Sequence, residues 1–220
     1  MSPRKSIEFN LLGNAQDSLR QAIQLLAFND VGSPQSQLKH AIVNTAHCVE
    51  LLLKERLRRV NPALVLKKTS EYPSLSAFTV GVNIAIKRLK SNGNVRITLE
   101  DEKTIEDLRD ERDDIEHYEW TTTEEDARRI VGKALSFVFA FGRSELGIDL
   151  TTEFRNDDTW RIFLDELYEF TEDYCGRLQE IMRTRGDDPV ECKNCGEEVA
   201  PWHGGNCELC GHWQDFEDTE

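Results

Sequence analysis

The sequence lacks several features that would place it in a common class. It has no run of about 18 apolar residues, so we expect no transmembrane helix. The first ten residues, MSPRKSIEFN, have no apolar signal core, which predicts a cytoplasmic protein that does not associate with membranes. Only 6 prolines and 13 glycines occur among 220 residues, too few for an all-β protein rich in tight turns. No glycine-rich phosphate loop is present, which argues against a nucleotide-driven motor.

Charge is distributed unevenly along the chain. Residues 1–98 carry a net charge of +8, whereas residues 99–220 carry −22. The basic N-terminal half could bind a polyanion such as a nucleic acid, whereas the acidic C-terminal half lowers the non-specific affinity of the protein for a polyanion. The overall net charge of −14 therefore describes neither half.

Apolar residues recur at helical spacing nearly throughout, which predicts a helical bundle. Ser33 and Pro34 suit the N-cap and first position of a helix, and Asn61 followed by Pro62 suits its end. Apolar and polar residues alternate from Val95 to Leu99, which indicates a short extended segment. We expect helices over about residues 11–26, 34–60, 74–89, 100–117, 123–145 and 159–183.

The predicted organisation is an all-α bundle over residues 1–185 and a small module over 190–220. Glycine, aspartates and proline over 186–189 mark the boundary. The helix after residue 123 has Phe137, Phe139 and Phe141 on both faces, which suggests the central helix of the bundle or a dimer surface.

The small module contains two Cys-x-x-Cys pairs, Cys192 with Cys195 and Cys207 with Cys210, each followed by glycine. Four thiolates so spaced favour a tetrahedral structural zinc site, with no open position for catalysis. Two disulfides or a redox-active pair are the alternatives. His203 and His212 are further candidate ligands. The module is acidic, so we expect it to contact protein, in cis or in trans, rather than nucleic acid.

The other two cysteines, Cys48 and Cys175, stand alone in apolar, helical stretches. We interpret them as small buried hydrophobic residues.

The helix ending near residue 117 carries Arg112, Asp113 and His117. The simplest interpretation is a solvated face with an i,i+4 pair between Arg109 and Asp113, and with His117 near a helix C-terminus that favours cations. Residues five apart lie about 140° apart on a helix, so Arg112 and His117 meet only if the helix ends or bends near His117.

Two segments together resemble the HEPN superfamily: HCVELLLKERL over 47–57 and RDDIEH over 112–117. The resemblance covers about residues 10–146. It implies a homodimer whose protomers each contribute Arg112 and His117 to a shared cleft. It also implies a metal-independent endoribonuclease of toxin–antitoxin or antiviral defence systems.

The resemblance also implies roles for the individual residues. Arg112 would bind the scissile phosphate and stabilise its transition state. His117 would act as general acid or base, and Asp113 would orient the pair. The RNA's own 2′-hydroxyl would attack.

A set of basic residues could follow the RNA phosphates, although an ordinary solvated helix end explains them equally well. This set comprises Lys54, Arg56, Arg58, Arg59, Lys67 and Lys68. A protein regulator, such as an antitoxin or a defence partner, could bind the acidic half.

Two rival functions are kept open. One is a catalytically inactive HEPN-like adaptor for dimerisation and binding. The other is a zinc-ribbon protein that acts in transcription or DNA binding.

Overall fold

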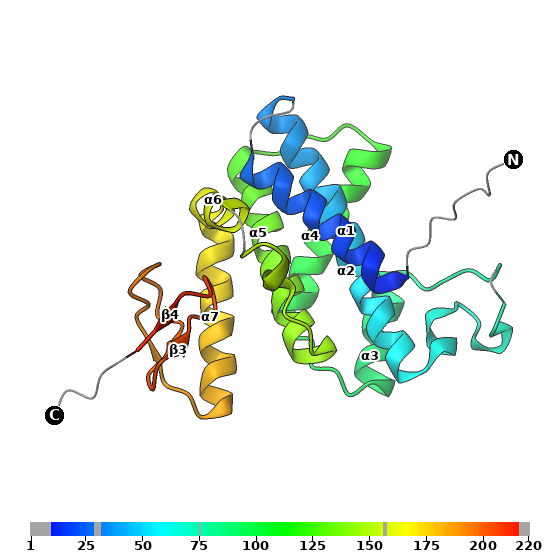
Figure 1. The fold of residues 1–220 in the computed structure, drawn as a ribbon. Helices are drawn as coiled ribbons and strands as arrows, with labels where there is room; N and C mark the ends of the chain where they lie inside the picture. The colour runs from blue at the N-terminus through cyan, green and yellow to red at the C-terminus, as the bar shows by residue number, and fades with distance from the viewer. Residues whose placement is uncertain (1–9, 29–31, 75, 156–157, 216–220) are drawn as a thin grey trace, which may run out of the picture.

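The computed structural model is mostly helical, as predicted, with short strands near the C-terminus (Figure 1). It describes residues 10–28, 32–74, 76–155 and 158–215. The N-terminal end of the predicted bundle and the C-terminal end of the predicted module therefore lie outside the described residues. None of the described helices has the length and apolar character needed to cross a membrane. The α-helices are α1 (Leu11–Ala27), α2 (Pro34–Val60), α3 (Val82–Asn92), α4 (Leu99–His117), α5 (Glu124–Phe141), α6 (Asp158–Glu166) and α7 (Tyr168–Arg185).

Helix α2 is the long central element, because it packs against α1, α3, α4 and α5. Its ends are those predicted. The Ser33 side chain accepts a hydrogen bond from the amide of Ser36, and Pro34 takes the first helical position. Asn61 adopts an extended conformation and ends the helix before Pro62.

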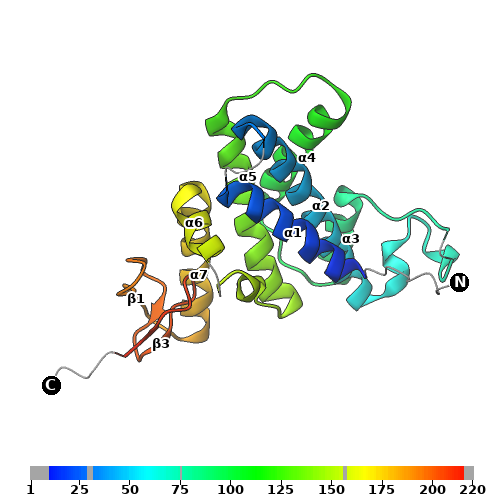
Figure 2. The ribbon, with the colours of Figure 1, turned by 45° about the horizontal axis from the view of Figure 1, so that its top comes forward.

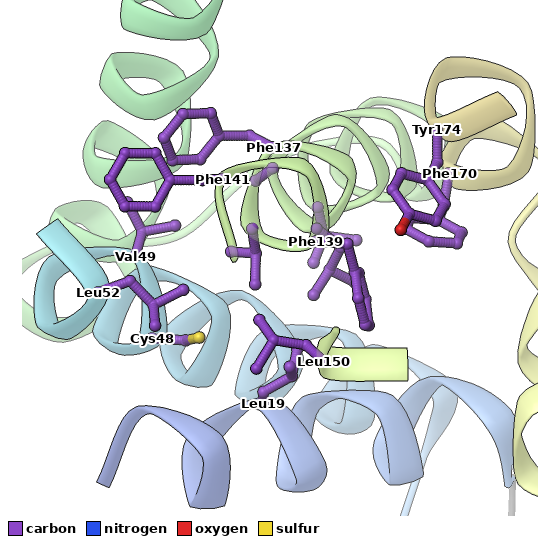
Figure 3. Close-up of a cluster of buried hydrophobic side chains, with 14 of the residues drawn as sticks. Leu19, Cys48, Val49, Leu52, Phe137, Phe139, Phe141, Leu150, Phe170 and Tyr174 are labelled. Atoms are coloured by element: carbon purple, nitrogen blue, oxygen red, sulfur yellow. The ribbon is translucent and has the colours of Figure 1, made fainter. Parts of the chain in front are cut away.

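Helix α5 also lies inside the bundle, and its three phenylalanines are buried. Phe137 and Phe141 lie on one side of α5 together with Val49 of α2 (Figure 3). Phe139 faces α7 instead, with its ring centroid 5.5 Å from that of Phe170. The aromatics on both faces of α5 are therefore explained by packing against two helices, which fits a central helix better than a dimer surface.

The predicted helix over 74–89 is wrong in its first half, because α3 begins only at Val82. The preceding segment runs antiparallel to residues 65–67. Lys67 N–H donates to the Phe78 carbonyl, and Val80 N–H donates to the Val65 carbonyl. Phe78 points outward and is 78% exposed, so it is not part of the core. Its spacing from the apolar residues of α3 nevertheless fitted a helical pattern, which explains the wrong prediction. Leu75, another member of that stripe, lies outside the described residues.

The predicted single helix over 159–183 is two helices, α6 and α7, which separate at Leu167. Helix α6 packs on α1 and α7 packs on α5, so a straight helix could not serve both partners. Phe163 and Phe170, on either side of the break, are fully buried with ring centroids 4.8 Å apart. Apolar residues keep their helical spacing across Leu167, so the sequence pattern gave no sign of the break.

Two other expectations changed in detail. Residues Val95 and Ile97 are buried in an extended linker that forms no strand, and Leu99 already belongs to α4. Helix α5 ends at Phe141 and continues as one π-helical turn over Gly142–Leu146.

The C-terminal module contains two antiparallel two-stranded sheets. Strand β1 (Pro189–Val190) pairs with β2 (Ala200–Pro201), and β3 (Gly205–Asn206) pairs with β4 (Trp213–Gln214). The module lies beside α7, on the side away from α2, α3 and α4, in both views (Figures 1 and 2). It therefore sits far from the end of α4.

Candidate functional site

Helix α4 ends at His117, and over its last turns the Arg112 and His117 side chains share two acidic neighbours. Tyr118 is extended, so the helix stops where the sequence analysis required. Arg112 Nη1 lies 2.9 Å from Asp113 Oδ1 and 2.9 Å from Glu116 Oε2. A ring nitrogen of His117 and a carboxylate oxygen of each acid lie within 4.8 Å of one another. The cluster of Arg112, Asp113, Glu116 and His117 is called here the α4 cluster.

The α4 cluster is accessible but electrostatically crowded. The Arg112 side chain is 28% exposed, and Nη2 also lies 3.9 Å from Glu50 Oε2 on α2. One guanidinium thus faces three carboxylates. Asp113, Glu116 and His117 are close enough to offer ligand atoms to a metal ion. The guanidinium of Arg112 already supplies a positive charge to both of those carboxylates, which weakens the case for a metal there.

The structure also bears on the simpler interpretation of this helix. The predicted pair between Arg109 and Asp113 does not form, because Arg109 turns toward α3 and donates to Asn83 Oδ1 at 2.6 Å. Asp113 pairs with Arg112 instead. His117 does lie in the last turn of α4, as predicted.

Most of the basic residues on α2 are engaged within the protein. Lys54 is buried and lies 2.6 Å from Glu50. Arg58 and Arg59 both pair with Glu55, whose side chain is only 2% exposed. Arg56 pairs with Glu145 at 3.2 Å. These contacts explain four of the six predicted RNA-binding residues as structural.

The two other predicted RNA-binding residues, Lys67 and Lys68, lie outside α2 and are exposed. Lys68 makes only a long 3.6 Å pair with Glu71. Lys67 lies over the exposed Phe78 ring, with Nζ 5.7 Å from the centroid. They are the members of the set that are free to meet phosphates.

The Glu55 carboxylate has a shifted pKa with a clear cause. Burial alone would raise its pKa, but hydrogen bonds and charges from Arg58 and Arg59 hold it below the usual value. The ion pairs at this end of α2 thus favour the charged form.

The four predicted cysteines converge in the C-terminal module. Their sulfurs all lie within 4.8 Å of one another, so together they could hold a metal ion. The Cys192 and Cys210 sulfurs are 3.7 Å apart, and those of Cys195 and Cys207 are 3.8 Å apart. These separations are too long for disulfides, which the alternative interpretation required. Neither His203 nor His212 belongs to the group.

Local geometry shapes both halves of this four-cysteine centre. Gly196 and Gly211 have φ of +76° and +75°, a left-handed conformation that disfavours residues with a Cβ. Their amides donate to the carbonyls of Cys192 and Cys207, which closes each turn. The Asn194 amide lies 3.4 Å from the Cys192 sulfur, as expected for donors near thiolates.

The module is anchored to the bundle in cis by residues that the sequence analysis did not single out. Trp160 Nε1 donates to the Leu209 carbonyl at 3.0 Å. Arg143 forms a close ion pair with Glu208, and Arg155 donates to the Glu208 carbonyl. These residues follow no recognisable spacing, so nothing in the sequence would have found them.

The remaining cysteines confirm their predicted role. Cys48 and Cys175 are buried, and burial raises the pKa of both thiols above the usual value. At neutral pH both are therefore uncharged and poorly reactive.

None of the protein-family models compared with the chain matches it, and no curated protein or solved structure is significantly similar to it. The geometry of the α4 cluster and of the four-cysteine centre therefore carries the functional argument.

Proposed function

We propose that the protein is a HEPN-type, metal-independent endoribonuclease that works as a homodimer in toxin–antitoxin or antiviral defence. One observation carries the proposal: at the exposed C-terminal end of α4, Arg112 and His117 share Asp113 and Glu116 as neighbours. This arrangement places a fixed cation and a proton-transfer group around the same two carboxylates.

The chemistry needs only these groups and the RNA. The 2′-oxygen forms a bond to phosphorus while the bond from phosphorus to the 5′-oxygen breaks, leaving a 2′,3′-cyclic phosphate. A neutral His117 accepts the proton of the 2′-hydroxyl, or a protonated His117 delivers one to the departing 5′-oxygen. In a shared cleft, the two histidines of a dimer divide these tasks. Arg112 stabilises the charge that builds on the phosphoryl oxygens.

The carboxylates around Arg112 set a requirement for this mechanism. A phosphate must replace at least one of them as the partner of the guanidinium. Glu116 is the best candidate to leave, because it belongs to the last turn of α4, while the Asp113 and Glu116 side chains are similarly exposed, at 43% and 40%. Asp113 lies directly beside Arg112 and suits the positioning role that the resemblance implies.

The first test is RNA cleavage by the purified full-length protein in the presence of EDTA. Wild type is expected to cleave, and Arg112→Ala and His117→Ala to lose at least about 100-fold in rate, the usual effect of removing a general acid or base. Arg109→Ala, on the same helix, is the matched control and should retain activity. Circular dichroism confirms folding throughout, since EDTA can also strip the cysteine centre. A folded dimer that cleaves none of a diverse RNA set would refute the proposal.

A catalytically inactive adaptor is the second candidate function. The observation that favours it is the neutralisation of Arg112 by three carboxylates, together with the internal pairing of the basic residues on α2. Such a protein would dimerise and bind a partner without cutting RNA. A protein regulator could contact the acidic half in either case.

We propose zinc as the metal of the four-cysteine centre. Sulfurs placed about 2.3 Å from a tetrahedral zinc ion are separated by about 3.8 Å, which agrees with the observed 3.7 and 3.8 Å. Four thiolates also match the preference of zinc for soft ligands. The four cysteines would hold the ion in a closed, structural site.

A further inference from the structure

A cleft of about 450 Å³ lies directly beyond the end of α4. The linker from α4 to α5 runs past the N-terminal end of α2 in both views (Figures 1 and 2). The cleft is lined by the first residues of α2, by linker residues 120–123 and by the start of α5. Its volume falls within the range of about 300–1,000 Å³ that is usual for small-molecule sites.

The cleft has an aromatic wall that is held in place. Trp120 lines it, and the indole Nε1 donates to Glu111 Oε2 at 2.5 Å, which fixes the ring against α4. Leu38 is the buried apolar residue at the α2 side. A pinned indole beside apolar side chains suits the face of a planar, uncharged ring.

Polar groups in the cleft are available to a ligand. Gln35, Thr121 and Thr122 line it, and none of their side chains bonds to any residue that the structure describes. No Lys or Arg is among the described lining residues, whereas Glu124 is, and its Oε1 accepts a hydrogen bond from Arg128 Nε at 3.0 Å. The cleft therefore disfavours a phosphate, and favours a neutral heterocycle that offers N–H groups to a carboxylate and to hydroxyls.

The cleft is close to the α4 cluster along the chain. Trp120 follows His117 by three residues, which span at most about 11 Å. A scissile phosphate beside His117 would thus have its neighbouring nucleotide within reach of Trp120. Phosphate recognition and base recognition would then be divided between two adjacent sites.

We propose that this cleft is a base-binding subsite, in which Trp120 stacks on one unpaired nucleobase next to the scissile phosphate. The inference rests on the proposed ribonuclease function. It adds that the enzyme takes single-stranded RNA and prefers particular bases at one position beside the cut. Bases that carry an exocyclic amino group are favoured over uracil, because Glu124 can only accept hydrogen bonds and uracil offers a single N–H donor, whereas an amino group offers two.

The test combines binding and cleavage by the full-length protein. Binding is measured by fluorescence anisotropy with 2′-O-methyl oligonucleotides, which cannot be cleaved by 2′-hydroxyl attack. Cleavage is mapped on a random-sequence RNA pool. The variants are Trp120→Ala, Trp120→Phe and Thr122→Val, and Trp202→Ala removes an exposed tryptophan in the C-terminal module as the matched control.

We expect Trp120→Ala to bind about five-fold or more weakly, in line with the usual effect of removing a stacking partner, and to lose the base preference. Trp120→Phe should retain binding, Thr122→Val should alter the base preference, and Trp202→Ala should match wild type. If Trp120→Ala does not fold, Thr122→Val decides, and an unchanged base preference in that variant overturns the subsite.

The outcomes separate the two proposals. Cleavage with wild-type affinity and preference in Trp120→Ala overturns the subsite and leaves the ribonuclease intact. Trp120-dependent binding without cleavage supports the subsite and overturns the ribonuclease. A wild type that neither binds nor cleaves overturns both.

Discussion

At the residue scale, the ion pairs of this protein serve two different purposes. Glu55 is buried under Arg58 and Arg59, so that its charge stabilises the end of α2. Arg112, by contrast, is partly exposed among carboxylates that are themselves half-exposed and can move. The ion pairs of Glu55 are structural, whereas the guanidinium of Arg112 is accessible to a phosphate under the proposed function.

We predict a pH-dependent loss of stability in Glu55→Gln. The folded-state pKa of Glu55 lies below its unfolded value of about 4.3. Its stabilisation is therefore fully present above that pH and is lost as the pH falls through the folded-state pKa. At pH 7 the variant should unfold with about 1–3 kcal/mol less free energy than wild type, and the difference should shrink at pH 3.5.

Urea titrations at the two pH values measure this difference. Glu71→Gln is the control, because its side chain is 40% exposed and its only described pair is long. It should change the free energy of unfolding by less than about 0.5 kcal/mol. An equal loss at both pH values in Glu55→Gln would contradict the assigned role of its charge.

At the scale of the element, α4 is positioned at its start as well as at its end. Thr98 and Asp101 form a capping box, in which each side chain accepts a hydrogen bond from the other residue's amide. Asp101 also accepts from Arg177 of α7 at 2.7 Å. The cap thus fixes the helix that carries Arg112 and His117 to a neighbouring helix.

We predict that Thr98→Ala lowers the free energy of unfolding by about 1–2 kcal/mol. Ser33→Ala, at the exposed N-cap of α2, should lower it less, because that cap has no tertiary partner among the described residues. Chemical denaturation of both variants measures the two losses. A larger loss for Ser33→Ala would show that the contact with α7 adds nothing to the cap.

Sequence analysis succeeded or failed according to whether local chemistry decided the element. Ser33 with Pro34, and Asn61 with Pro62, define helix ends by rules that act over a few residues, and those ends were predicted. The break at Leu167 depends on α6 and α7 packing against different helices, which no local pattern reveals. The pairing of residues 65–67 with 78–80 is likewise a tertiary choice.

The candidate site follows the same division. The four cysteines and the end of α4 at His117 could be predicted, because spacing and helix ends are local properties. The pairing of Lys54 with Glu50 is also local, since the two are four residues apart on α2, whereas the pairing of Arg56 with Glu145 could not be predicted, because it depends on where the turn after α5 lies.

At the scale of the whole molecule, the C-terminal module is joined to the bundle through buried contacts. Val199, Ala200 and Leu209 of the module belong to the same hydrophobic cluster as Phe163 and the other core residues. Asp149 connects the two parts, because it pairs with both Arg143 and Arg155, which contact the module. Order in the module should therefore support α6 and α7.

We predict that removing the metal destabilises the bundle as well as the module. A strong zinc chelator, or the Cys195→Ser variant, should lower the melting temperature by several degrees, because the contacts of Trp160 and Arg155 with Leu209 are lost. Differential scanning calorimetry measures the shift, and restored zinc should reverse it in wild type alone. An unchanged melting temperature after verified metal loss would show that the bundle is independent of the module.

The central claim is that Arg112 and His117 cut RNA through its own 2′-hydroxyl, without a metal at the α4 cluster. The most direct test is mass spectrometry of the product ends after cleavage by wild type in chelator. The account predicts 2′,3′-cyclic phosphate on one fragment and 5′-hydroxyl on the other. Fragments with 3′-hydroxyl and 5′-phosphate ends would contradict it, since they require an attacking water rather than the 2′-hydroxyl.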